Sequence, residues 1–271
     1  MPEGPEIKKV VDNLENIFGN FNIKLNNVLL NAGRYTKNKP KNYNEFIKEL
    51  PLKINSVNCK GKFIWFEFEN NWSAWITFGM TGRFTLDENL NHNNVSFVFN
   101  KFNLYFNDIR NFGTIMFYNN PIELDKKLKS LGPDILNNKQ FSLDVFKNLL
   151  LKKTYQNKEI GVLLMEQKFI SGIGNYLRAE ILYDAKINPF RIISSLNQND
   201  ITNLYNSIIK ISKQSYDKQV KTYVSDHNEL NKYTSGYKFL VYQRTEDKFG
   251  NPVKNEKLGT RTMWWVPNIQ K

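Results

Sequence analysis

The first residues of the chain, MPEGPE, place a proline and a carboxylate where they could act together. Methionine is normally removed when a small residue such as proline follows it, which would leave Pro2 with a free secondary amine. An α-amino group has a pKa of about 8, so a neutral, nucleophilic fraction exists at physiological pH. Attack of a secondary amine on C1′ of a sugar gives an iminium ion that cannot lose an N–H proton. Such an ion is an electron sink that drives elimination of the sugar's phosphate groups.

Glu3 follows the proline directly and could shuttle protons for this chemistry. The alternative is plain: Met-Pro is an ordinary translation start, and Glu3 is a negative charge at the start of a helix, where it is stabilising. The first residues alone leave both interpretations open.

A second candidate site is GIGNYLRAEIL at residues 172–182. Gly172 and Gly174 permit a tight turn whose amides face outward, ahead of a helix N-terminus that can hold a phosphate without any charged side chain. Asn175 adds a side-chain donor. The turn could instead be a simple connection between helices with glycine as a C-cap. The spacing also suits a helix-hairpin-helix motif, which grips the DNA backbone as well.

Composition limits the class of protein. The 271 residues are 41% hydrophobic and 24% charged, which suits a globular chain of two domains. The net charge of +12 favours a polyanionic partner such as nucleic acid, with a basic proteome average as the alternative. A single cysteine, Cys59, excludes an intrachain disulfide and a cysteine-based metal site, and the distant His92 and His227 argue against a Ser-His-Asp triad or a zinc hydrolase.

The hydropathy of the sequence indicates where in the cell the protein is expected. The chain has no apolar run of about 18 residues and no signal-peptide pattern. We therefore expect a soluble intracellular protein without membrane contact, in the cytoplasm or the nucleus depending on the host.

The elements that must position these residues follow from periodicity. Residues 4–20 read as an amphipathic helix with Pro5 in its first turn and Gly19 at its end. From about 21 to 120, aromatic and β-branched runs separated by Asn- and Gly-rich turns are typical of an antiparallel sandwich or barrel. SLGPDIL at 130–136 is a plausible domain boundary. Helical patterns follow, the last with Asp200 as its N-cap candidate, and residues 237–270 read as a β-hairpin.

Seven motifs occur in order along the chain: MPEGPE, GKF at 61–63, FGMTGRF at 78–84, NDIRNFG at 107–113, LGPD at 131–134, GIGNYLRAE at 172–180 and GTRTMWW at 259–265. Together they resemble the formamidopyrimidine-DNA glycosylase / endonuclease VIII family, closest to its zincless animal and giant-virus endonuclease VIII-like members. The resemblance implies an α+β fold. A β-sandwich domain with an N-terminal helix spans 1–130, a linker 131–138, and a helix-two-turn-helix domain 139–271, ending in a hairpin finger at about 237–271.

The resemblance also implies residue roles. Catalysis would fall to Pro2 as nucleophile, Glu3 as proton-transfer acid, Glu6 as an organising acid and Lys62 beside the lesion phosphate. Phosphate binding would use Asn175 and Arg261, with Gly172 and Gly174. The gap left by an extruded base would be filled by Met80, Arg110 and Phe112, although core packing is the simpler explanation of Met80 and Phe112 taken singly. Glu180 matches an acidic residue of the helical domain, with a structural role as its alternative.

The chain departs from the family pattern in three places. Most relatives end in a zinc finger with two cysteine pairs. Here Val266 and Ile269 stand where the second pair would be, and the first falls in RTEDKFG, also without cysteine. We therefore expect no metal or other cofactor, and a hairpin held by apolar contacts of Phe239, Val241, Trp264 and Trp265. Gly161 stands where many relatives carry lysine, and residues 215–237 lack an obvious 8-oxoguanine-capping loop.

These residues together predict a bifunctional DNA glycosylase and AP lyase of base excision repair. It would excise oxidised pyrimidines, formamidopyrimidines and further-oxidised guanine, and cut the abasic site by β,δ-elimination. We expect a monomer that binds damaged double-stranded DNA, with single strands left open. The alternatives are a catalytically inactive DNA-binding protein of the same fold and an 8-oxoguanine-preferring glycosylase. A helix-hairpin-helix nuclease would need a metal-binding carboxylate cluster, which the sequence does not display.

Overall fold

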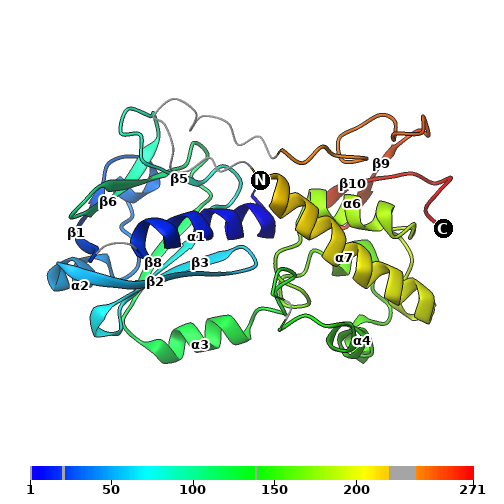
Figure 1. The fold of residues 1–271 in the computed structure, drawn as a ribbon, viewed down its shortest axis with the longest axis horizontal. Coiled ribbons are helices and arrows are strands. Elements are labelled where there is room, and N and C mark those ends of the chain that lie inside the picture. Colours follow the sequence, from blue (N-terminus) through cyan, green and yellow to red (C-terminus); the bar gives the residue numbers. More distant parts are fainter. Residues whose placement is uncertain (1, 20–21, 138, 220–235) are drawn as a thin grey trace. The chain divides into compact units, whose positions relative to one another are not determined.

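A computed structural model describes residues 2–19, 22–137, 139–219 and 236–271 (Figure 1). The chain divides into two compact units. Of the described residues, unit 1 contains Pro2, 6–19 and 22–129, and unit 2 contains Glu3–Pro5, 130–137, 139–219 and 236–271. Three residues of the N-terminal tip thus belong with the second unit, which the linear division of the sequence did not anticipate.

Unit 1 is built on eight antiparallel strands and the helix α1, Gly4–Gly19. The strands are β1 Lys24–Leu30, β2 Leu52–Lys60, β3 Phe63–Phe68, β4 Ser73–Thr77, β5 Arg83–Thr85, β6 Asn93–Phe99, β7 Asn103–Asn107 and β8 Thr114–Tyr118. They are hydrogen-bonded in the order β5-β7-β6-β1-β2-β3-β4-β8. The short helices are η1 Gly33–Thr36, α2 Tyr43–Glu49, η2 Glu69–Asn71 and α3 Pro121–Lys129.

The strands form a sandwich, because the sheet folds over at the short β1–β2 pairing. Only Lys24 with Lys53 and Leu25 with Leu52 pair there. Across the interior, Phe66 of β3 stacks on Phe84 of β5, with ring centroids 5.7 Å apart, although these strands are far apart in the sheet order. This confirms the expected antiparallel sandwich, and it buries the alternating apolar side chains of both halves against each other.

The predicted N-terminal helix is confirmed as α1. Its apolar stripe is buried, with side chains at most 8% exposed: Ile7, Val10, Val11, Leu14 and Phe18. The ring centroid of Phe18 lies 6.0 Å from that of Phe66, so the helix closes the same core as the strands. The tip of the chain is therefore fixed by packing rather than frayed.

Unit 2 is mainly helical and ends in a hairpin. Its elements are α4 Leu143–Leu150, η3 Lys153–Tyr155, α5 Ile160–Leu163, α6 Asn175–Asp184, η4 Ile193–Ser195, α7 Gln198–Lys218, β9 Lys254–Leu258 and β10 Arg261–Trp265. Helix α6 is buried from Tyr176 to Tyr183 and packs against α7 and β10 (Figure 1). Segment 131–135 also packs here, since Ile135 is buried and the hydroxyl of Ser171 donates to the carbonyl of Gly132.

The N-cap prediction for α7 was wrong by three residues. Asn197 is the N-cap, and its side chain accepts from the N–H of Asp200 at 2.9 Å. Asp200 is the third helical residue, and its carboxylate accepts from the N–H of Asn197 at 3.0 Å. The pair forms a capping box, in which either residue alone would suit the cap and the reciprocal bonds decide the register.

Within the described ranges, none of the helices combines the length and hydropathy that crossing a membrane requires.

Candidate active site

Glu3 is held at the N-terminus of α6. Its Oε2 accepts hydrogen bonds from the amides of Gly174 at 2.6 Å and Leu177 at 3.2 Å, and its Oε1 accepts one from Tyr176 at 3.0 Å. The first amides of a helix have no partner within the helix and carry the positive end of its dipole. The carboxylate therefore satisfies three of these donors at once, and Glu3 is only 1% exposed.

Gly4 explains the glycine within MPEGPE. Its amide donates to the carbonyl of Gly172 at 2.8 Å. A Cβ at residue 4 would lie 3.0 Å from the Cα of Gly172 and 3.2 Å from its carbonyl oxygen. Backbone approaches backbone here at a distance that only glycine tolerates without displacement. This contact brings Glu3 within reach of the α6 amides.

The amides of Gly172 and Gly174 have partners other than the phosphate that the sequence suggested. The N–H of Gly172 donates to Oε1 of Gln167 at 3.0 Å, and that of Gly174 donates to Glu3. We therefore revise the assignment of these two glycines as a phosphate cradle. The helix N-terminus does hold an anion, but the anion is a side chain of the protein itself.

Asn175, the first residue of α6, is joined to the hairpin through a buried arginine. Arg178 Nη2 donates to Oδ1 of Asn175 at 2.5 Å and to the carbonyl of Thr262 at 3.2 Å, and its Nη1 donates to the carbonyl of Gly161 at 3.0 Å. Nδ2 of Asn175 donates to the same Thr262 carbonyl at 3.1 Å. Sequence reasoning missed Arg178, although the motif GIGNYLRAE places it one helical turn after Asn175.

Arg261 precedes Thr262 at the start of β10, and its side chain is exposed. The structure thus brings together two predicted phosphate-binding residues, Asn175 and Arg261, on adjoining elements of unit 2. Desolvation lowers the pKa of Arg178 to about 10, with Glu3 and Tyr242 raising it and Arg261 lowering it further. The first turn of α6 and the hairpin therefore form one electrostatic neighbourhood.

Gly161 lets the hairpin approach α5 closely. A Cβ at this position would lie 2.5 Å from Cδ2 of Leu258 and 2.8 Å from the carbonyl oxygen of Pro189. The position where many relatives carry a lysine therefore has no room for a side chain unless both Leu258 and the backbone at Pro189 move.

Glu180 has the structural role that was its alternative in the sequence. It is fully buried, and its carboxylate accepts from the amides of Leu240, Val241 and Tyr242 at 2.8–2.9 Å. Burial raises its pKa, and these hydrogen bonds oppose that rise. It fixes the segment that leads into the finger.

Among the catalytic candidates of unit 1, Pro2 and Glu6 are buried, and Lys62 is half-buried in the turn between β2 and β3. Glu6 lies in the first turn of α1. Met1 and His227 lie outside the described residues. So do most of residues 215–237, the segment in which the sequence lacks an obvious counterpart of the 8-oxoguanine-capping loop.

The proposed void-filling residues lie on two loops joined by Asp108. This buried carboxylate accepts from the hydroxyl of Thr81 at 2.5 Å and from the amides of Gly113 at 2.7 Å and Arg110 at 3.3 Å. Phe112 is 52% exposed, so the core-packing explanation of this residue does not hold. The guanidinium carbon of Arg110 lies 4.8 Å from the centre of the Phe112 ring.

Met80 is half-buried on the first of these loops. Its neighbour Gly79 touches the backbone of Phe112, because a Cβ on Gly79 would lie 2.7 Å from the carbonyl carbon of Phe112. Met80, Arg110 and Phe112 therefore lie on two loops that are joined by the Asp108 hydrogen bonds and by the close approach of Gly79 to Phe112. Asp108, which accepts the hydrogen bonds between the two loops, is part of the motif NDIRNFG, but the sequence alone does not indicate this role.

The finger is organised by apolar side chains and one carboxylate. Val241, Trp265 and Val266 are buried in the core of unit 2, and Phe239, Trp264 and Ile269 pack against it. In RTEDKFG, Asp247 is 5% exposed and accepts from the amides of Phe249 and Asn251 and from the hydroxyl of Tyr183. Burial raises the Asp247 pKa, but these bonds and the Asn251 side chain outweigh it, so the pKa is lowered.

No group of three or more His, Cys, Asp or Glu side chains suited to a metal ion occurs in the described part of the chain. Val266 and Ile269, the residues at the expected positions of the second cysteine pair, offer no metal-binding side-chain atoms.

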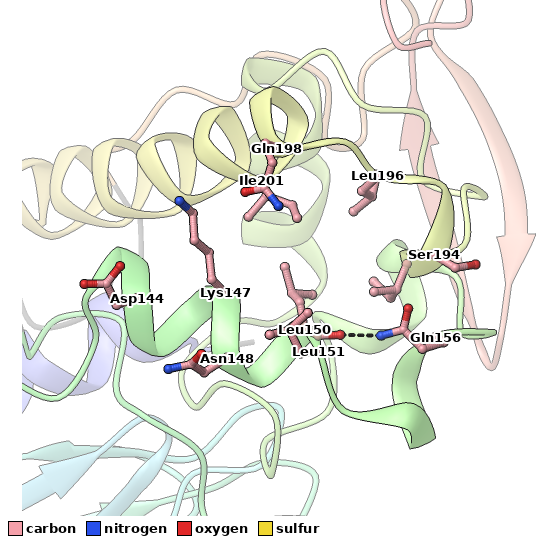
Figure 2. A pocket seen from close by; sticks show the side chains of 11 residues that line it. Asp144, Lys147, Asn148, Leu150, Leu151, Gln156, Ser194, Leu196, Gln198 and Ile201 are labelled. Atoms are coloured by element: carbon pink, nitrogen blue, oxygen red, sulfur yellow. Dashed lines mark hydrogen bonds between the residues drawn. The ribbon is translucent and has the colours of Figure 1, made fainter.

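A cavity of about 480 Å³ lies elsewhere in unit 2, between α4, η4 and the start of α7. Figure 2 shows the Lys147 side chain of α4 extending toward α7, which carries Gln198 and Ile201. None of the predicted site residues lines this cavity, so it is separate from the site described above.

Comparison with known proteins matches the whole length of the chain. Residues 1–115 match the formamidopyrimidine-DNA glycosylase N-terminal domain, 131–225 the H2TH domain and 228–271 the C-terminal domain. The formamidopyrimidine-DNA glycosylase of Prochlorococcus marinus (strain MIT 9301) is 32% identical, with 100% of both chains covered.

Two solved structures have the same fold. A Lactococcus lactis Fpg mutant in complex with DNA containing Fapy-dG gives a TM-score of 0.83 at 25% identity, with 100% of both chains covered. A complex of the Lactococcus lactis Fpg with DNA containing an abasic site gives 0.81 at 25% identity, with 99% of both covered. These matches do not separate the endonuclease VIII-like members from the rest, so that subtype stays a prediction. The three domains in order, together with a full-length relative above 30% identity, show that the chain belongs to the formamidopyrimidine-DNA glycosylase family.

Proposed function

We propose that this family member excises oxidised bases from DNA and cleaves the resulting abasic site, with Pro2 as the nucleophile. The observation that carries the proposal is the anchoring of Glu3 by three amides of the α6 N-terminus. An anchored residue 3 gives the preceding residue a defined place, which a nucleophile requires and a loose terminus does not provide. Damaged DNA is the proposed partner, in keeping with the DNA complexes of the Lactococcus lactis relative and the charge of +12.

The proposed reaction starts after removal of Met1. The neutral amine of Pro2 attacks C1′ of the damaged nucleotide, a C–N bond forms, and the bond from C1′ to the base breaks as the base leaves with a proton. Ring opening gives an iminium ion at C1′. Loss of a C2′ proton expels the 3′ phosphate, and a second elimination expels the 5′ phosphate. Water then hydrolyses the iminium and frees Pro2.

Proton transfer is assigned to Glu3, and the α6 amides serve to hold its carboxylate in one orientation while the proton is exchanged. Glu6, on the first turn of the same helix, is the proposed organising acid. Lys62 is the proposed cation beside the lesion phosphate, a role that its place in a turn between strands suits.

DNA binding is assigned to two further groups. Asn175 and Arg261 would hold phosphates that flank the lesion, since one offers an amide donor and the other a planar guanidinium. Met80, Arg110 and Phe112 would enter the gap left by the flipped base. An exposed aromatic ring with a guanidinium on its face can restack neighbouring bases and offer hydrogen bonds to the unpaired one.

The preferred lesions are proposed to be oxidised pyrimidines, formamidopyrimidines and further-oxidised guanine. The Fapy-dG complex of the Lactococcus lactis relative supports the second class. The reason to rank 8-oxoguanine lower is that Gly161 offers no side chain where many relatives carry lysine.

The test is a panel of oligonucleotides that each carry one lesion, as duplexes and single strands, incubated with the processed protein. Single-turnover excision rates should be highest for formamidopyrimidines, oxidised pyrimidines and hydantoin-type guanine products, with strand cleavage that leaves phosphate on both ends. Borohydride should trap a covalent adduct on abasic DNA. DNA binding without excision of any lesion, and without an adduct, would show a protein of the same fold that has lost catalysis.

Arg261→Ala is expected to weaken binding to duplex DNA that carries a tetrahydrofuran abasic analogue by about 10-fold, on the scale of one charge-assisted contact. The slope of log K against log salt should fall by about 0.9, because one fewer phosphate is neutralised. Fluorescence anisotropy at several salt concentrations measures both. Lys213→Ala removes an exposed charge from α7 and is the matched control. An unchanged slope in Arg261→Ala would remove Arg261 from the phosphate contacts.

Treatment with EDTA or 1,10-phenanthroline is expected to leave excision rates and melting temperature unchanged, because the finger is built from Val241, Trp265 and the Asp247 turn. Elemental analysis of the purified protein should find less than one zinc per ten chains, by our expectation of no metal site. Stoichiometric zinc release coupled to loss of activity would overturn the zincless assignment.

A further inference from the structure

Arg178 is a cation in an unusual place. Its side chain is 1% exposed on a helix whose other faces are also buried. Burying a guanidinium is costly unless its donors are paired, and arginine is among the residues least often found inside. Two of its nitrogens donate to three oxygens, which belong to Asn175, Thr262 and Gly161. Two of these oxygens lie on, or next to, the residues proposed to bind phosphate.

The directions of these bonds determine how Asn175 lies. A guanidinium has only donors, so the atom of Asn175 that faces it must be the carbonyl oxygen Oδ1. The other polar atom of the amide is then the nitrogen Nδ2. Nδ2 donates to the Thr262 carbonyl, the same oxygen that accepts from Arg178 Nη2, so these hydrogen bonds join Asn175, Arg178 and Thr262 in one cluster. A phosphate oxygen only accepts hydrogen bonds, so a phosphate held by the Asn175 side chain would have to meet Nδ2, whose position these bonds fix.

The same guanidinium acts on the hairpin. The carbonyl of Thr262 receives hydrogen bonds from both Arg178 and Asn175, and Arg261 is the next residue back along β10. The backbone at the base of the Arg261 side chain is therefore fixed to the first turn of α6. The third hydrogen bond of Arg178 goes to the carbonyl of Gly161 and links α6 to α5. At Gly161, Leu258 of the hairpin occupies the space that a side chain would need.

We propose that Arg178 is a positioning residue for DNA binding, which fixes the orientation of the Asn175 side-chain amide and holds the β10 backbone that carries Arg261. The proposal rests on the proposed phosphate contacts of Asn175 and Arg261. Arg178 itself does not touch the DNA. It makes two separate phosphate-binding residues into one preformed clamp, so that less ordering is required when DNA binds.

A double-mutant cycle tests the proposal. Wild type, Asn175→Ala, Arg178→Met and the double variant are compared in binding to duplex DNA with a tetrahydrofuran analogue, at several salt concentrations, with melting temperatures measured in parallel. Asn175→Ala should weaken binding by about 10-fold, on the scale of one hydrogen bond to a charged group. Arg178→Met should weaken it at least as much and lower the salt slope, because Arg261 loses its fixed base.

The decisive readout is coupling. Adding Arg178→Met to Asn175→Ala should cost clearly less affinity than it costs in the wild type. A residue that only stabilises the fold would cost the same factor in both backgrounds, and that additive result would overturn the proposal. If Asn175→Ala alone leaves binding unchanged, the proposed phosphate contact fails instead, so the two failures are distinguishable.

Conservative variants keep the test valid if Arg178→Met does not fold. Arg178→Lys keeps a donor-only cation and should retain most of the affinity. Arg178→Gln offers both a donor and an acceptor, so it no longer dictates the orientation of Asn175 and should bind several-fold more weakly. Equal, wild-type affinity in both folded variants would contradict the proposal. Arg191→Met, which removes another arginine of unit 2 with side-chain partners at Ser195 and Asp200, should change melting temperature without changing affinity.

Discussion

Retention of Met1 is expected to abolish covalent chemistry while leaving DNA binding largely in place. With Met1 attached, the nitrogen of Pro2 is a tertiary amide, and its lone pair is delocalised into the peptide bond. No nucleophile then exists at residue 2. Strand cleavage at abasic sites should fall by on the order of 10³-fold or more, the scale on which loss of a covalent nucleophile is felt. The borohydride-trapped adduct should disappear.

The measurement compares processed protein with a version that carries a non-cleavable N-terminal extension, both checked by mass spectrometry. Affinity for tetrahydrofuran-containing duplex is the control, because it does not require the amine. Pro2→Gly tests whether proline itself is needed or whether any free N-terminal amine suffices. The variant keeps a primary amine at the terminus but lacks the secondary amine from which the iminium ion forms. If the extended protein forms adducts at the normal rate, the nucleophile is another amine, and peptide mapping of the adduct would identify it.

Glu3→Gln is expected to reduce both stability and excision. Glutamine retains one acceptor oxygen and places an NH₂ group against amides that themselves donate, so at least one of the three hydrogen bonds at Gly174, Tyr176 and Leu177 is lost. A buried donor without an acceptor, together with the lost charge at the helix N-terminus, should cost about 2–4 kcal/mol of the free energy of unfolding. Excision should fall by about 10²- to 10⁴-fold, as for loss of a general acid.

Urea denaturation and single-turnover excision measure the two effects. Glu15→Gln makes the same chemical change at an exposed position of α1 and should alter neither. Glu3→Asp keeps the charge but shortens the reach by one methylene, so it should recover part of the stability. A stable Glu3→Gln protein with full activity would falsify both the anchoring and the catalytic role of Glu3.

Helix α6 organises much of unit 2 from a single stretch of sequence. Its N-terminal amides hold Glu3, Asn175 and Arg178 fix the base of the hairpin, and Glu180 holds residues 240–242. Two buried charges on a helix interior are expensive; the Glu180 carboxylate accepts from three amides, and two of the three Arg178 nitrogens are hydrogen-bonded, while its Nε has no hydrogen-bond partner within the described part of the chain. The helix therefore couples the proposed chemistry, phosphate binding and the finger through short-range contacts.

The sequence alone determined the elements and the family. The amphipathic pattern of α1, the aromatic alternation of the strands and the helical periodicity after residue 140 each depend on neighbours within one or two turns, so they can be read locally. The seven ordered motifs indicated the family. In the structure, Phe112 is exposed and the Arg110 guanidinium lies over its ring, and both residues come from the motif NDIRNFG.

Only the tertiary structure decided which groups meet. It showed that the amides of Gly172 and Gly174 are occupied by Gln167 and Glu3, that Gly4 is required by its contact with Gly172, and that Asn197 rather than Asp200 caps α7. It also revealed Arg178 and Asp108 as the groups that hold others in place. Most of these contacts join groups that are distant in the sequence, so the local periodicity of apolar residues cannot predict them. The physical reason is that a buried donor or acceptor must find a partner, and packing alone determines which partner is near.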